Sequence, residues 1–191
     1  MNTQEKNSNH FVLKGLVSIL IGIFIFGVAY LIKTILKEFL TDDSPLGMLS
    51  TEIIEIFIIF LIFCGLLFAS LVLFFSGKRS AKKKQYPLWN QKTKTAFRKY
   101  ILFIIIAFGS LMLLFNLGFV EYLTPTFLII YAFLLFTFKN KARKNLLILA
   151  GLNVFLALIC FLIPSYWFAS FSILGIAHIT YGVVEKTKIA S

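Results

Sequence analysis

Long apolar runs are the feature that most restricts how this chain folds. Between residues 56 and 76, for example, the sequence carries no charged side chain at all. About 20 apolar residues in a helix cross the roughly 30 Å of a bilayer's hydrocarbon. Lipid offers no hydrogen bonds to an open backbone, so such runs must form helices or a closed barrel. The even strand alternation of a barrel is absent. With 59% hydrophobic and only 14% charged residues, the chain is predicted to be an integral membrane protein.

The apolar runs predict an all-α membrane protein with six transmembrane helices in a single transmembrane domain over residues 1–191. The predicted spans are 11–33, 53–76, 98–117, 120–138, 146–163 and 165–184. We expect three helical hairpins, because "RKYILFIIIAFGSLMLLFNL" (98–117) and "RKNLLILAGLNVFLALICFL" (143–162) align with a shift of 45 residues. No small-residue cleavage site follows the first run, which we interpret as a retained helix. Cys64 and Cys160 lie within runs and are predicted to be packing residues rather than a disulfide.

The charges between the runs predict the orientation of the helices. If the N-terminus is cytoplasmic, 17 of 19 basic residues fall on the inner side and six of eight acids on the outer side. Cytoplasmic loops of membrane proteins collect Lys and Arg, so both termini are predicted to be cytoplasmic and residues 77–97 to form a basic cytoplasmic loop. This bias also explains the net charge of +11 without nucleic acid, which we do not expect as a partner.

Clustered basic residues in that loop are candidate contacts for anionic lipid headgroups, at about 1 kcal/mol each. The candidates are Lys78, Arg79, Lys82, Lys83 and Lys84. Membrane lipids at the inner face are therefore the expected partners. Docking of an acidic cytoplasmic partner through the same cluster is the alternative.

Small residues form stripes on three of the predicted helices. They are Gly15, Ser18, Gly22 and Ala29, then Ala150, Asn153 and Ala157, and finally Ser172, Gly175 and Gly182. Such stripes let helices approach closely in lipid, where no hydrophobic force drives association. We interpret them as internal packing surfaces. A homo-oligomer formed through one of them is the alternative.

A polar cluster is predicted within the last hairpin from Asn153, His178 and Tyr181. At a rise of 1.5 Å per residue, Asn153 and His178 lie at similar depths in adjacent antiparallel helices. We expect His178 to be a neutral, buried histidine that is hydrogen-bonded to Asn153, with Tyr181 near, because unpaired polar groups are costly in lipid. A proton-sensing or relay histidine is the alternative, since ionisable groups inside membranes often mark pathways.

Motifs for catalysis are missing from the sequence. It contains no HExxH, GxSxG or P-loop pattern and no cluster of Cys and His, and its two histidines are His10 and His178. We therefore predict no enzymatic activity, no catalytic residue, no cofactor and no metal site.

The last hairpin resembles the helical hairpin of HdeD-like acid-resistance membrane proteins. The resemblance rests on Gly151, Pro164, "LGI" at 174–176 and Gly182, and "LKGLVSILIGIF" (13–24) is similar to the family's opening. The middle hairpin departs from that pattern, with Phe119 where the repeat would place Pro. The ending "LGxxHIxYG" is also similar to uncharacterised six-helix bacterial membrane proteins. The HdeD-like resemblance implies a six-helix fold and a non-enzymatic role in envelope stress.

These observations predict a non-catalytic protein of the bacterial inner membrane that serves the stress response or membrane maintenance. Two alternatives remain open. One is a small transporter or channel with a polar path near Asn153 and His178. The other is an accessory subunit that docks a partner through its basic loop.

The predicted orientation is testable by cysteine labelling of intact cells. Ser80 lies in the basic segment, so a Ser80→Cys variant made without Cys64 and Cys160 should resist a membrane-impermeant reagent added from outside. The same residue should become reactive once the membrane is permeabilised. Labelling from outside in intact cells would show that the orientation is opposite to the predicted one.

Overall fold

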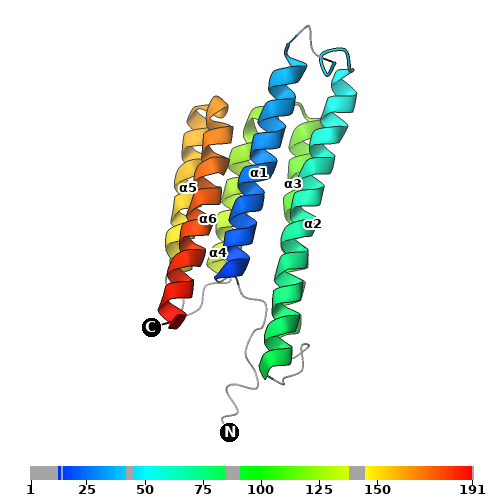
Figure 1. Ribbon diagram of the computed structural model, residues 1–191. Coiled ribbons are helices and arrows are strands. Elements are labelled where there is room, and N and C mark those ends of the chain that lie inside the picture. Colours follow the sequence, from blue (N-terminus) through cyan, green and yellow to red (C-terminus); the bar gives the residue numbers. More distant parts are fainter. Residues whose placement is uncertain (1–12, 14, 42–44, 85–90, 138–144, 191) are drawn as a thin grey trace. The chain divides into compact units, whose positions relative to one another are not determined.

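The computed structural model is helical throughout the part of the chain that it describes, which is residues 13, 15–41, 45–84, 91–137 and 145–190 (Figure 1). Six α-helices and two short 3₁₀-helices occur there, and no strand does. The helices are α1 (Leu16–Phe39), α2 (Thr51–Lys84), α3 (Gln91–Asn116), η2 (Val120–Tyr122), α4 (Leu123–Thr137), α5 (Asn145–Leu162), η3 (Pro164–Tyr166) and α6 (Trp167–Ala190). The all-helical class predicted from the apolar runs is confirmed.

Five helical segments among the described residues are long and apolar enough to cross a membrane. They are Leu16–Phe39, Thr51–Arg79, Thr93–Asn116, Val120–Thr137 and Pro164–Thr187, and the apolar part of α5, Leu146–Leu162, is shorter. The fourth segment reaches this length only because η2 precedes α4. These lengths are those of a membrane protein, as the sequence predicts.

The first helix differs from its predicted span of 11–33 at both ends. Its regular part begins at Leu16, after Gly15, whose φ of 53° is a left-handed conformation that favours glycine. It continues through Lys33 to Phe39, because a charged side chain ends the apolar run but does not interrupt backbone hydrogen bonding. Span prediction locates the edge of the hydrocarbon, and the helix extends beyond it.

Helix α2 also corrects the prediction that residues 77–97 form a loop. Its backbone stays helical through Lys84, and α3 begins at Gln91. Lys, Arg and Ala all have high helix propensity, so the basic sequence after the apolar run can prolong the helix into water. Residues 85–90 lie outside the described residues.

The chain divides into two compact units. The first, called here the α1–α6 unit, comprises residues 14–72 and 171–191, and therefore α1, most of α2 and most of α6. In it, Phe24 of α1 stacks on Phe68 of α2 with ring centroids 4.1 Å apart. A Cβ atom at Gly65 would lie 3.7 Å from both Phe24 and Val28, in ordinary van der Waals contact. Helix α1 therefore packs against α2 through aromatic and aliphatic side chains.

The second unit, called here the α3–α5 unit, comprises residues 1–13 and 73–170. Helix α4 packs against α5 and α3 packs against α4. The interior is aliphatic, with Leu128, Leu135, Leu146, Leu149 and Leu156 all buried. At one end the rings of Tyr122 and Phe161 lie 5.7 Å apart.

The two cysteines are free thiols, as predicted, and Cys160 is buried in the α3–α5 unit. Its Sγ donates a hydrogen bond to Ser170 Oγ over 3.0 Å. This contact ties the end of α5 to the first turn of α6, across the short η3 turn. Cys160 thus behaves as a small packing residue with a weak donor.

Candidate functional site

Three residues at the start of α1 face three residues of α6 in the α1–α6 unit. Gly15, Ser18 and Gly22 follow one another at intervals of three and four residues, and so do Gly175, His178 and Gly182. These intervals place each set on one face of its helix. The observed pairs are Gly15 with Gly182, Ser18 with His178, and Gly22 with Gly175. Numbers rise along one helix as they fall along the other, so the two helices are antiparallel at this contact.

The glycines bring the two backbones into direct contact. A Cβ atom on Gly22 would collide with the carbonyl oxygen of Gly175, and one on Gly175 would lie 2.8 Å from the carbonyl oxygen of Gly22. A Cβ atom on Gly182 would lie 2.6 Å from the carbonyl oxygen of Gly15. Contacts this short are not found for real Cβ atoms, so any other residue at Gly22, Gly175 or Gly182 would force the helices apart. Gly15 contributes its carbonyl oxygen to the contact, and a Cβ atom on it would meet nothing within 4 Å. We call these four residues the glycine seam.

Ser18 and His178 form a hydrogen-bonded pair between the two ends of the glycine seam. The Ser18 hydroxyl donates to the backbone carbonyl oxygen of His178 over 2.9 Å. The same hydroxyl oxygen lies 3.2 Å from Nδ1 of the His178 ring. Because the hydroxyl proton is already directed to the carbonyl, its oxygen accepts from an Nδ1–H group. Both side chains are 0% exposed.

This pairing leaves His178 suited to a neutral role. A neutral imidazole with its proton on Nδ1 matches the serine oxygen. An unpaired donor or acceptor in the bilayer interior costs up to several kcal/mol. Hydrogen bonds measured between membrane helices contribute about 1 kcal/mol each. The hydrogen bonds therefore hold the polar pair in the contact and align α1 with α6.

Asn153 and Tyr181, the other members of the predicted polar cluster, are also buried. Asn153 Nδ2 donates to the carbonyl oxygen of Leu149 within α5, over 2.7 Å. Its Oδ1 atom is buried and has no hydrogen-bond partner among the described residues. Asn153 belongs to the α3–α5 unit, so its predicted bond to His178 stays a prediction. The bond that is present in the α1–α6 unit is to Ser18.

Sequence reasoning identified the small-residue stripes of α1 and α6 but missed that these two stripes pair. The available signal was the shared spacing, in which a glycine, a polar residue and a second glycine stand three and four residues apart in both helices. Sequence reasoning sought the partner of His178 in the preceding helix, where Asn153 lies at a similar depth, and did not consider α1. Depth alone does not select a partner, because every helix of a bundle offers a residue at each depth.

The basic residues predicted to contact lipid headgroups lie on the last turns of α2. Lys78, Arg79 and Lys82 are exposed. The side chains of Lys83 and Lys84 lie outside the described residues. Within the described part of the chain, no group of three His, Cys, Asp or Glu side chains is arranged to hold a metal ion.

Comparisons with known proteins add no further assignment. No family model, curated protein or solved structure matches the chain. What the fold and the site define is the class: a helical protein whose apolar helices are long enough to span a membrane, with a buried serine–histidine pair in its α1–α6 unit.

The glycine seam predicts that two glycines of α1 differ in their tolerance of a methyl group. Gly22→Ala should destabilise the protein by about 1–3 kcal/mol, the usual cost of overpacking, because its Cβ meets the backbone of α6. Gly27→Ala is the matched control, since outside its own stretch of helix backbone nothing lies within 4 Å of its Cβ position. Thermal unfolding in detergent checks both. Equal stability of the two variants would contradict the seam.

The serine–histidine pair predicts a specific rescue. His178→Asn keeps an amide donor near the position of Nδ1 and should retain most of the stability. Ser18→Ala should cost about 1 kcal/mol by leaving the ring donor without this partner. A double-mutant cycle of Ser18→Ala with His178→Leu should give a coupling energy of about 0.5–1.5 kcal/mol. Additive effects in the cycle would show that the two side chains do not interact.

Proposed function

We propose that this chain is a non-catalytic protein of the bacterial inner membrane that serves membrane maintenance or the response to envelope stress. Its six helices form three hairpins, with both termini in the cytoplasm. The observation that carries the proposal is the environment of the buried histidine. His178 is fully buried, is hydrogen-bonded to Ser18 and stands between two backbone contacts of the glycine seam. A histidine held in this way supports helix packing.

A proton or ion relay would need a different environment for His178. Relay groups exchange protons with water or with a chain of ionisable partners, and they must change hydrogen bonds as they do so. The Ser18 hydroxyl engages both the ring and the backbone of His178, so moving the ring breaks a contact that also aligns the helices. This coupling favours a structural role over transport.

One observation favours the second candidate, a small transporter or channel. Oδ1 of Asn153 is buried without a hydrogen-bond partner among the described residues. An unsatisfied buried carbonyl is costly and is often found where a ligand or water binds. A polar path near Asn153 would use that atom. The two candidates therefore assign function to different residues, which makes them separable by experiment.

The proposal predicts a defined pattern of complementation in a strain that lacks the protein. Survival of acid challenge should fall in the deletion strain and return with the wild-type gene. It should also return with His178→Asn and Gly27→Ala, which leave the helix contact intact. Gly22→Ala should restore less survival at equal expression. Unchanged survival on deletion, or full rescue by Gly22→Ala, would count against the proposed role.

The transporter candidate is tested by proton flux into liposomes. Vesicles that contain the purified chain and enclose a pH-sensitive dye should acidify no faster than empty vesicles. Flux above that level, abolished by Asn153→Ala and kept by Ser18→Ala, would replace the structural proposal with transport.

A further inference from the structure

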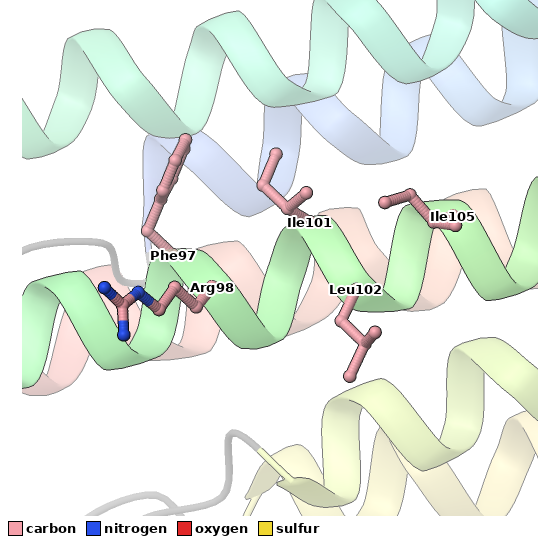
Figure 2. Close-up of a pocket in the computed structure, with 5 residues that line it drawn as sticks. All are labelled: Phe97, Arg98, Ile101, Leu102 and Ile105. Carbon is pink, nitrogen blue, oxygen red and sulfur yellow. The ribbon is translucent and has the colours of Figure 1, made fainter.

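Two adjoining hollows lie along α3, away from the residues discussed so far. The first has a volume of about 320 Å³ and is lined by Phe97, Arg98, Ile101, Leu102 and Ile105 (Figure 2). The second has a volume of about 450 Å³ and is lined by Gln91, Lys94, Thr95 and Arg98. Arg98 lines both of them. The two hollows therefore meet at Arg98 on a single helix, and we call them together the α3 groove.

The α3 groove arises from two parallel rows of side chains. Residues four apart on a helix form a ridge, and a groove lies between neighbouring ridges. One ridge consists of Lys94, Arg98 and Leu102. The neighbouring ridge consists of Phe97, Ile101 and Ile105. Figure 2 shows Phe97 and Ile101 projecting from one side of the α3 ribbon and Leu102 from the opposite side.

The chemistry of the α3 groove changes along its length. At the end near Gln91 it carries two cationic side chains, Lys94 and Arg98, both exposed. The Thr95 hydroxyl there donates to the carbonyl oxygen of Gln91, so the two cations and the Gln91 amide are the remaining polar groups. Beyond Arg98 every lining side chain is aliphatic, and Phe97 lies beside Arg98. The change from charged to apolar occurs at Arg98.

No acidic residue balances these cations nearby in the sequence. From residue 56 to residue 120 the chain contains no Asp or Glu. The first turn of α3 likewise has no acid. The charged end of the α3 groove thus complements an anion. Because an apolar surface adjoins this end, an anion that carries an apolar chain would fill both parts.

The dimensions of the α3 groove suit a phospholipid. From Arg98 to Ile105 the helix rises about 10 Å, and from Lys94 to Arg98 about 6 Å. A phosphate held by the two cations would place the first part of an acyl chain beside Ile101 and Ile105. Arg is well suited to this position because its guanidinium binds phosphate oxygens through two parallel hydrogen bonds. Its aliphatic stem also packs along apolar surface.

We propose that the α3 groove is a binding site for one anionic glycerophospholipid. Lys94 and Arg98 bind the phosphate, and one acyl chain lies between the two ridges, against Ile101, Leu102 and Ile105. This site is separate from the basic residues at the end of α2, which line neither of the two hollows. It goes beyond the proposed function, which requires no bound lipid.

The site is tested by titrating the delipidated full-length chain in detergent with phosphatidylglycerol and counting bound lipids by native mass spectrometry. Arg98→Gln should weaken the tightest binding event about fivefold, which corresponds to about 1 kcal/mol for one basic residue. Lys99→Gln is the matched control, because it removes the same charge one residue away and lines neither hollow. Its affinity should stay within twofold of the wild type.

Two further measurements separate a lipid site from a simple anion site. Ile105→Trp, which fills the apolar half without changing charge, should also weaken binding. Inorganic phosphate should fail to displace the lipid, and phosphatidylcholine should bind more weakly than phosphatidylglycerol. The proposal is overturned if Lys99→Gln matches Arg98→Gln, if Ile105→Trp has no effect, or if phosphate competes at the lipid's own concentration. None of these outcomes depends on the result of the acid-survival test.

Discussion

The direct backbone contact between α1 and α6 is the interaction on which the α1–α6 unit depends. In lipid, an apolar side chain gains nothing by leaving hydrocarbon for a protein interior, so close packing and hydrogen bonds must hold helices together. The glycine seam supplies the close packing, and it makes the hydrogen bonds between Ser18 and His178 possible. Absence of a side chain at Gly22 and Gly175 lets carbonyl oxygens approach the opposite helix, and weak Cα–H···O contacts are favoured at such distances. The approach also brings Ser18 within reach of His178.

This contact has a consequence for how the chain assembles. Ser18 and His178 are 160 residues apart in the sequence. The contact therefore joins the first turn of α1 to α6. It forms only after α6 has been made and inserted. Until then, Ser18 has the option of bonding to a carbonyl in its own helix, as Thr34 does with Tyr30. The first helix thus has an acceptable state in lipid before its partner arrives.

The sequence predicts the helices directly, but it does not identify the contact between α1 and α6, for one physical reason. Apolar runs report the transfer of side chains into hydrocarbon, a property of each segment alone, and so the helical class was predictable. Helix ends such as Lys84 were not, because backbone hydrogen bonding continues where the hydrocarbon stops. Partner choice depends on two segments at once. Matched depth, the criterion that pairs Asn153 with His178, is only one coordinate of a contact, and so it could not identify Ser18.

The polar pair and the glycine seam determine different aspects of the contact between α1 and α6. Glycines permit close approach at several registers, since a flat surface can slide. A shift of one helical turn would place Gly22 opposite His178 and Ser18 opposite Gly182, so the ring would meet backbone instead of a hydroxyl. That state leaves a buried polar group unsatisfied, which is costly in lipid. The glycines therefore determine how close α1 and α6 come, and the serine–histidine pair determines the register at which they meet.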